Sequence, residues 1–295
     1  MTEQASNSFL DVQTLLESSE PRMRGLGLWY VGGVFVLMML VGALAGAQNA
    51  VAKQAVEVLS SVAMVGLIAT MGVSAWFAAR GVQREQQKME AIAELLQLRR
   101  WGEAGVMLQE LLSSPTRTPQ TRIQALIFLA AVLARFHRFG DAIAVYDHLL
   151  DMGFEDDETV HGLKLGRAMG MLHEDRLFDA DRAISELRRD QREHESAGLY
   201  LVEIYRDVKT GHPQEAIGLF REKLPALRQQ LGHRVVDAYA LAARAYDLLG
   251  QADQAQAAYE AATHLMPEAE LQRRYAEVAA LAGKYSPAVR PTEVA

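Results

Sequence analysis

An alanine returns at nearly constant intervals through the last two-thirds of the chain. The steps between successive copies are 38, 38, 36 and 39 residues, and each copy lies four residues before a larger apolar side chain: Ala104, Ala142, Ala180, Ala216 and Ala255. A period of this length is typical of stacked helix pairs, in which no unit can bury its apolar face alone. The sequence therefore predicts an all-α array, and such arrays usually present binding surfaces.

Two uncharged apolar runs precede the array, Leu26–Ala47 and Val58–Ala79, each 22 residues long. Since a helix rises ~1.5 Å per residue, either run is long enough for the ~30 Å hydrocarbon core of a bilayer. The residues between them, 48–57, are polar and suit a short turn. The sequence therefore predicts a transmembrane hairpin. Gly81 is the one weak point between the second run and the first repeat, so a continuous helix and a hinge both remain open.

Basic residues flank the hairpin on the side of the two chain ends. They lie just outside the apolar runs, whereas the turn holds only Lys53: Arg22, Arg24, Arg80, Arg84 and Lys88. Because flanks rich in Lys and Arg stay in the cytosol, both termini and the repeat array are expected there. The excess of Arg over Lys and the many alanines favour a GC-rich bacterial genome. We therefore expect a multi-pass protein of the bacterial inner (cytoplasmic) membrane, in contact with lipid through two spans.

Two other interpretations of the apolar runs remain open. Arg22 and Arg24, the apolar run and an Ala-x-Ala pattern at Ala43-Leu44-Ala45 or Ala45-Gly46-Ala47 resemble a cleavable signal peptide. Both runs could instead be buried helices of a soluble domain. Gly42 and Gly46 form a G-x-x-x-G pair that lets two helices approach closely. That pair suits membrane packing within the hairpin or a homo-oligomer.

Composition divides the chain into four parts. They are 1–24, a cytosolic tail with a short amphipathic segment; 25–84, the transmembrane hairpin (spans 26–47 and 58–79) with a juxtamembrane helix; 85–284, the repeat domain; and 285–295, a flexible tail. The apolar residues of the first part are Phe9, Leu10, Val12, Leu15 and Leu16. They suit one or two helical turns that rest on the bilayer or on the repeats, with a disordered tail as the alternative.

The fifth unit of the array carries the densest pattern. Two small residues let a pair of helices approach, two tyrosines fill the space beside them, and a proline ends the second helix: Ala243, Ala255, Tyr246, Tyr259 and Pro267. This pattern resembles the tetratricopeptide repeat (TPR) family. The resemblance implies an all-α fold in which the transmembrane hairpin is followed by a TPR-like α-solenoid of about five helix pairs. An expected capping helix, Glu268–Lys284, closes the array.

The resemblance also implies a partner-binding groove lined by the first helix of each pair. Carried over by register, its candidate residues are Gln124, Ile127, Arg135, Leu165, Met169, His173, Leu201, Tyr205, Lys209 and Arg244. The groove is mostly apolar with basic side chains at its edge, which suits an amphipathic helix or an extended peptide with an acidic flank. Asn is absent from these positions, so the family's clamp for a C-terminal carboxylate is not expected.

Composition and motifs exclude several kinds of chemistry. The formal charge of −7 offers no basic stripe to nucleic acid, and the absence of cysteine excludes thiolate nucleophiles and cysteine-ligated zinc. No phosphate-binding glycine loop, nucleophile elbow or His-Glu-x-x-His pair occurs. We therefore expect no catalytic residue, no cofactor and no metal, and the chain is not expected to be an enzyme.

These features together predict a membrane-anchored scaffold or adaptor that binds a protein partner at the cytosolic face of the membrane. A narrower alternative is an accessory subunit of an envelope machine, such as exopolysaccharide synthesis or secretion. An alternative from another class is a component of a metabolic membrane enzyme. The identity of the partner, the pathway, the oligomeric state and the register of the weaker repeats are not written in the sequence.

Overall fold

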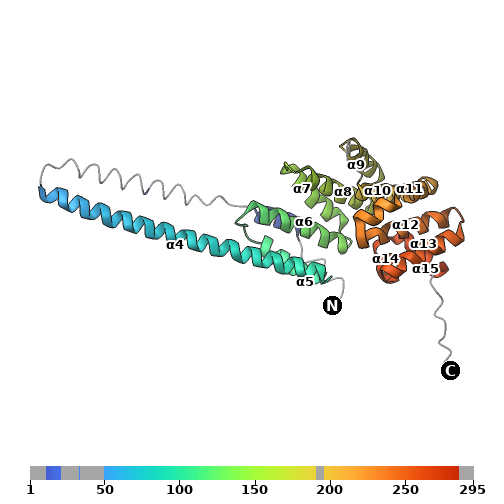
Figure 1. Ribbon diagram of the computed structural model, residues 1–295, viewed down its shortest axis with the longest axis horizontal. Coiled ribbons are helices and arrows are strands. Elements are labelled where there is room, and N and C mark those ends of the chain that lie inside the picture. The colour runs from blue at the N-terminus through green and yellow to red at the C-terminus, as the bar shows by residue number, and fades with distance from the viewer. Residues whose placement is uncertain (1–10, 21–32, 34–49, 191–195, 286–295) are drawn as a thin grey trace, which may run out of the picture. The chain divides into compact units, whose positions relative to one another are not determined.

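The chain is all-helical in the residues that the computed structural model describes, which are 11–20, 33, 50–190 and 196–285 (Figure 1). This part of the chain contains no strand, so the predicted all-α class is confirmed. Contacts divide the chain into two compact units, residues 1–128 and 129–295.

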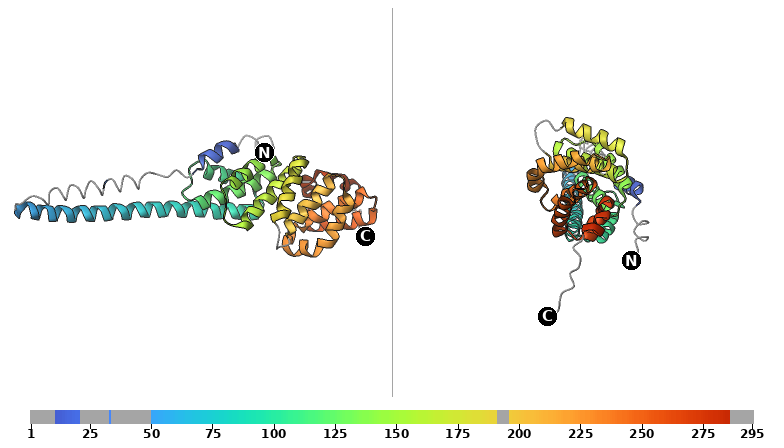
Figure 2. Two further views of the ribbon diagram at one scale, coloured as in Figure 1. Left: turned by 90° about the horizontal axis from the view of Figure 1, so that it is seen from above. Right: turned by 90° about the vertical axis from the view of Figure 1, so that its right-hand side faces the viewer.

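One helix of 48 residues, α4 (Ala50–Gln97), is the longest element described in the first unit (Figures 1 and 2). Residues 50–57, which we expected in a turn, are its first two turns, so that prediction is wrong. They contain neither Gly nor Pro, and good helix formers such as Ala, Lys and Gln prevail there. The helix also continues through Gly81 without a break, which settles the choice between a continuous helix and a hinge. At ~1.5 Å per residue, α4 is about 70 Å long.

Large apolar side chains are exposed in the middle of α4. Between 49% and 61% of the surface of each is accessible: Ile68, Met71, Val73, Trp76 and Phe77. Even so, none of the helices in the described ranges combines the length and hydropathy needed to cross a membrane. The first expected span, residues 26–47 with Gly42 and Gly46, lies outside the described residues except for Gly33.

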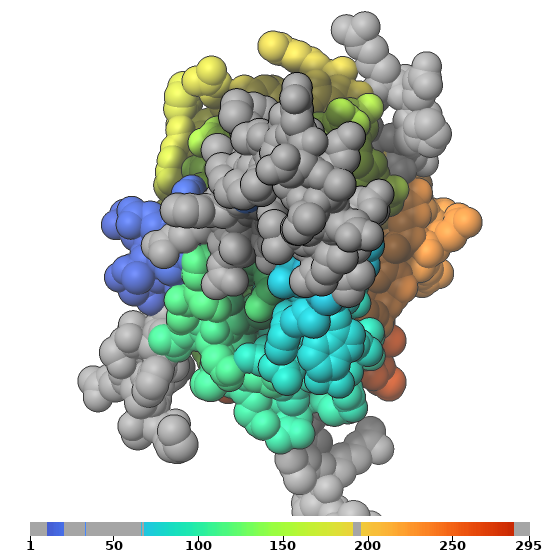
Figure 3. Space-filling view, turned by 90° about the vertical axis from the view of Figure 1, so that its left-hand side faces the viewer, coloured from blue at the N-terminus to red at the C-terminus, as the bar shows by residue number. Residues whose placement is uncertain are grey.

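The short helix α2 (Val12–Ser18) packs on α5 (Trp101–Leu112) within the first unit, and Figure 3 shows it in blue against the green residues of that unit. Val12 and Leu15 are buried. The Ser19 carbonyl accepts a hydrogen bond from the Thr116 hydroxyl at 3.1 Å, and the buried Arg122 guanidinium donates to the Leu16 carbonyl at 2.8 Å. Of the settings considered for the N-terminal apolar residues, the structure therefore places 12–18 on the first repeat. Phe9 and Leu10 lie outside the described residues.

The remaining helices follow one another in the alternating order expected of helix pairs. They are α6 (Pro119–Arg135), α7 (Phe139–Asp151), α8 (Asp157–His173), α9 (Leu177–Asp190), α10 (Ala197–Lys209), α11 (Pro213–Leu231), α12 (Val235–Leu248) and α13 (Ala252–Leu265). From α7 onward they belong to the second unit, in which α8, α10 and α12 contact one another in turn. The first helices of the last three pairs therefore lie side by side.

The same turn joins the two helices of every pair. A residue with a left-handed backbone (φ between 55° and 78°) lies five residues before each of the periodic alanines: Arg99, His137, Asp175, Gly211 and Gly250. The next residue donates its backbone N–H to the carbonyl five residues back, at 2.8–3.0 Å in all five turns. This is the Schellman closure of a helix C-terminus, and here it reverses the chain at a fixed distance from the alanine.

The periodic alanines are all buried, with at most 1% of their surface exposed. Four residues further along, Leu108, Ile184 and Tyr259 are fully buried as well. A side chain of one carbon lets the second helix of a pair approach the first, and the larger side chain one turn later fills the space beside that contact. The core of each pair is therefore built around the alanine.

The C-terminal residues do not form the single capping helix that we expected. They form α14 (Glu268–Arg274), the 3₁₀ turn η2 (Ala276–Val278) and α15 (Ala279–Tyr285). The helix breaks at Tyr275, whose backbone is extended (φ −128°, ψ 102°) and whose side chain is 4% exposed. Burial of this ring outweighs the continuation of a regular helix. Residues 286–295, most of the expected tail, lie outside the described part of the chain.

The shared turn predicts opposite effects for two glycine substitutions. Gly250 has φ 70° and open space around it, so Gly250→Ala forces a Cβ into the left-handed region and lowers the free energy of unfolding by about 1 kcal/mol. Gly218 lies within α11, also in open space, so Gly218→Ala raises the free energy of unfolding by about 0.5–1 kcal/mol. Urea denaturation followed by circular dichroism measures both. If both substitutions change the free energy of unfolding in the same direction, the left-handed conformation assigned to Gly250 is contradicted.

Candidate partner-binding face

The candidate groove residues fall on both units. Gln124 is exposed and Ile127 is half-buried in the part of α6 that belongs to the first unit. In the second unit Leu165 and Met169 pack partly buried against the core, and Leu201 is 1% exposed. The other candidates lie near or against residues 268–285, which we call the C-terminal segment: Arg135, His173, Tyr205, Lys209 and Arg244.

Aromatic rings form the centre of this contact. The His173 imidazole on α8 stacks on the Phe139 ring with 4.2 Å between centroids and 5° between planes. Its other neighbours are Tyr205 of α10, at 5.0 Å, and Tyr275 of the C-terminal segment, at 5.6 Å. Tyr205 and Tyr275 meet edge to face at 5.2 Å. Both tyrosines are buried, so the cluster joins α8, α10 and the segment in one apolar contact.

A polar layer borders the rings. The Tyr205 hydroxyl donates a hydrogen bond to Glu277 at 3.3 Å, and the Lys209 ammonium lies 2.7 Å from the same carboxylate. Lys209 also donates to Asp175 at 2.6 Å. Burial opposes the charge on Lys209, but the hydrogen bonds to Asp175 and Glu277 outweigh it and raise the pKa of Lys209. Burial, together with the Glu277 charge, raises the pKa of Tyr205 well above its ordinary value. Lys209 is therefore charged and Tyr205 neutral throughout the physiological range.

Helices α6 and α12 supply further ion pairs to the segment. Glu270 lies 3.3 Å from the Arg135 guanidinium at the end of α6. Arg274 donates to Asp237 on α12 at 3.0 Å, where Asp237 is 2% exposed and burial raises its pKa despite the nearby arginine. Near the other end of α12, Asp247 accepts from Lys284 at 2.9 Å. Arg244 reaches the segment only indirectly, because it pairs with Asp247 at 2.9 Å.

We call the first-helix side chains of the second unit that contact the C-terminal segment the covered face. They come from the first helices of four successive pairs: Arg135 of α6, His173 of α8, Tyr205 and Lys209 of α10, and Asp237 and Asp247 of α12. Figure 1 shows α14 and α15 beside α12 and α13. The face thus combines an aromatic centre with cations and carboxylates that pair with a peptide segment.

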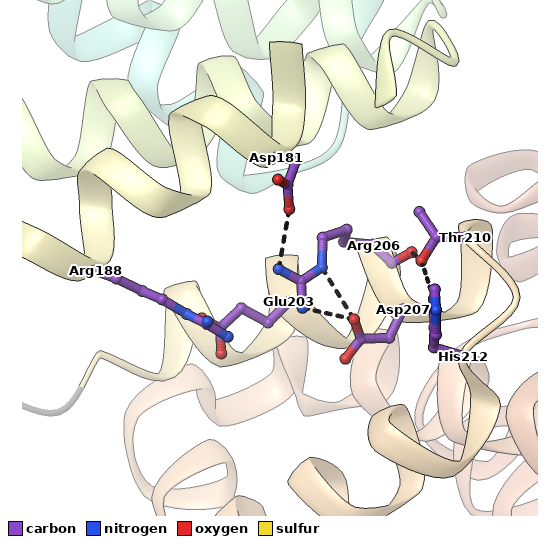
Figure 4. Close-up of polar contacts among 7 residues, drawn as sticks. All are labelled: Asp181, Arg188, Glu203, Arg206, Asp207, Thr210 and His212. Atoms are coloured by element: carbon purple, nitrogen blue, oxygen red, sulfur yellow. Dashed lines mark hydrogen bonds and ion pairs between the residues drawn. The ribbon is translucent and has the colours of Figure 1, made fainter. Parts of the chain in front are cut away.

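An ion network holds α10, the helix that carries Tyr205 and Lys209, against α9 (Figure 4). The Arg206 guanidinium donates to Asp207 at 2.7 and 2.9 Å and to Asp181 of α9 at 3.3 Å. Arg188 of α9 pairs with Glu203, which is buried, as is Asp207. Hydrogen bonds to buried carboxylates fix the rotation of a helix, because a slip leaves the charges unpaired. The network therefore positions the covered face.

Sequence reasoning missed the partners that the segment contributes. The sequence predicts a cap at 268–284 because an open array needs its last apolar face covered, and that argument names no contact with α6, α8 or α10. The break at Tyr275 depends on tertiary burial, which no local pattern reports. The acidic residues Glu270 and Glu277 gave a partial signal, because the basic edge of the predicted groove favours an acidic ligand.

Other parts of the described chain offer less to a ligand. A hollow of about 310 Å³ lies among α7, α8 and α9, and its basic residues Lys164 and Arg167 already pair with Asp190 and Asp147. Within the described ranges, no group of three or more His, Asp or Glu side chains is placed to hold a metal ion.

Comparison with known proteins identifies no relative: no protein-family model, no curated protein and no solved structure matches this chain. The function is therefore argued from its residues and their geometry.

Burial of His173 predicts a pH-dependent stability. Burial lowers the pKa of His173 to about 4, from about 6.5 in an unfolded chain. Between these values the unfolded chain binds more protons, so stability is complete above pH 6.5 and is lost as the pH falls toward 4. The loss at pH 5 is about 2 kcal/mol. The charged and titratable groups that face the imidazole are Glu277, Lys209, His137, Asp175, Tyr205 and Tyr275.

Urea denaturation at pH 7 and pH 5 tests this linkage in three chains. The difference in unfolding free energy between the two pH values shrinks in His173→Gln and persists in His264→Gln, whose imidazole is exposed on α13. A difference in His173→Gln as large as in the wild type excludes this imidazole as the group that titrates.

Proposed function

We propose that this chain is a membrane-anchored, tetratricopeptide-like scaffold that binds a protein partner at the cytosolic face of a bacterial inner membrane. The covered face is the observation that carries the proposal. The first helices of four pairs there direct charged and aromatic side chains toward one peptide segment. An aromatic centre bordered by paired charges is the composition of a peptide-binding surface.

The five identical turns support the tetratricopeptide-like assignment. Each reverses the chain five residues before a buried alanine, so one local geometry is repeated in every pair. In repeat proteins each unit contacts its neighbours and the stacked first helices form an extended surface. The contacts among α8, α10 and α12 fit that arrangement.

The exposed apolar side chains of α4 support the membrane anchor. Ile68, Val73 and Phe77 expose more than half of their surface, which is costly in water and favourable in lipid. The Trp76 ring lies next to Phe77, and the Arg80 guanidinium is 3.8 Å from the Trp76 ring centroid. Aromatic and basic residues concentrate in this way at the cytosolic boundary of a bilayer. The helix then continues into the first repeat, so the anchor and the array share one element.

Cell fractionation followed by affinity capture tests both halves of the proposal. The tagged full chain is expected in the carbonate-washed membrane pellet. Ile68→Arg/Val73→Arg should reduce the pelleted fraction severalfold, because each arginine costs about 2.5–3.5 kcal/mol inside a bilayer. Val106→Arg is the matched control, since Val106 is equally exposed (61%) but lies on α5. Release of the wild-type chain by carbonate contradicts the anchor.

Capture from detergent-solubilised membranes tests the binding half. The wild-type chain should enrich a defined protein that Arg135→Glu loses at least tenfold. Arg182→Glu should retain it, because that side chain is 77% exposed on α9 and lies outside the covered face. Equal capture by Arg135→Glu and Arg182→Glu excludes the covered face as the binding surface.

A further inference from the structure

The C-terminal segment extends well beyond the last helix pair. Its chain leaves α13 with an extended backbone at Met266 (φ −150°, ψ 140°) and Pro267 (φ −55°, ψ 137°). A simple cap covers only the last apolar surface of an array. This segment packs on α13, and it also contacts side chains of α6, α8, α10 and α12, up to 135 positions earlier in the sequence, as in the pair Arg135–Glu270.

The segment carries the features of a bound peptide. Its apolar side chains are buried along one side: Leu271, Tyr275, Val278 and Leu281. Its charged side chains pair with three helices: Glu270 with Arg135 of α6, Arg274 with Asp237 of α12 and Glu277 with Lys209 of α10. Buried ion pairs add little net stability compared with apolar packing, but they are costly to mispair. Such pairs select the register and identity of what lies on the face.

The covered face is poorly suited to stand open. Loss of the segment exposes the Tyr205 ring and leaves Asp237 and Lys209 without their segment partners. An occupant of matching chemistry restores these contacts. The segment is also short, broken at Tyr275 and joined to α13 by two extended residues, so it can leave without unfolding α13. Replacement of the segment by another peptide therefore costs less free energy than removal of the segment with nothing in its place.

We propose that residues 268–285 are an internal ligand of the covered face and that the partner displaces them with a segment of the same chemistry. This partner segment carries a buried aromatic anchor with a carboxylate on each side, at the spacing of Glu270, Tyr275 and Glu277. The inference rests on the proposed function of the face as a partner site. A short tether gives an internal ligand an effective concentration of about 1 mM, so a peptide with an intrinsic Kd of about 1 μM binds roughly a thousandfold more weakly.

A peptide supplied in trans tests the proposal on the full chain in detergent micelles. The probe is a fluorescein-labelled synthetic peptide of residues 267–285, followed by fluorescence anisotropy. Glu270→Arg/Glu277→Arg places like charges against Arg135 and Lys209 and weakens the hold of the internal segment. This variant should bind the wild-type peptide at least tenfold more tightly than the unaltered chain does. The same peptide with Tyr275→Ser should bind this variant at least tenfold more weakly than the wild-type peptide does.

The matched control is Glu222→Arg/Glu260→Arg, which reverses two exposed glutamates on α11 and α13. It should bind the peptide as weakly as the unaltered chain. Equal affinity in Glu270→Arg/Glu277→Arg and this control overturns the proposal. So does dimerisation of the wild-type chain through exchange of the segment between copies, because the occupant is then a second copy.

A cross-link provides the complementary test if the charge-reversed chain fails to fold. The chain has no cysteine, so Asp247→Cys/Lys284→Cys accepts a bismaleimide at these two positions alone; the Asp247 and Lys284 side chains lie 2.9 Å apart, and the partner chemistry proposed above does not use this pair. The link holds the segment in place and should reduce partner capture at least tenfold relative to the same chain before linking. If the cross-linked chain captures the partner as well as the unlinked chain does, the partner does not displace the segment. That result leaves the proposed scaffold function intact. Loss of all capture in the unlinked wild type, with peptide binding retained, contradicts the scaffold function instead.

Discussion

The close approach of two helices at a buried alanine is the contact on which the rest of the second unit depends. Each alanine follows a left-handed residue by five positions, so the turn lies at a fixed distance from the helix contact in every pair. With the helices of a pair fixed in this way, the first helices of successive pairs lie side by side. That placement brings Arg135, His173, Lys209 and Asp237 to a common peptide segment, although they are far apart in sequence.

Charge is used differently in two places. Between α9 and α10, Arg188 of α9 pairs with the buried Glu203, and Arg206 of α10 pairs with Asp181 of α9, so these pairs fix one helix on the other. On the covered face the pairs join the array to a segment that begins after the last repeat. The first arrangement favours rigidity of the array, and the second favours selection of what the array holds. This division of roles fits the scaffold function proposed above.

Sequence patterns predicted those features of the fold that depend on neighbouring residues in the chain. The alanine period located the helix pairs because a one-carbon side chain is required at each crossing, and register placed His173, Tyr205 and Lys209 on first helices. The non-glycine residues in the left-handed turns, Arg99, His137 and Asp175, carry no sequence signal of that geometry. The polar character of residues 48–57, between two apolar runs, predicts a turn, although the helix propensity of 50–57 is good and these residues are helical. The break at Tyr275 arises from contacts with α8 and α10, which no window of sequence contains.

Native-state hydrogen exchange tests most directly whether the segment is an occupant or part of the array. The relevant amides are those of Leu271 and Tyr275, which bond to the carbonyls of Pro267 and Leu271, and those within α10 and α12. An exchangeable occupant opens without unfolding the array, so the segment amides should exchange at least tenfold faster than those of α10 and α12. Exchange of both sets at one common rate means that the segment and the array unfold together, which contradicts the account.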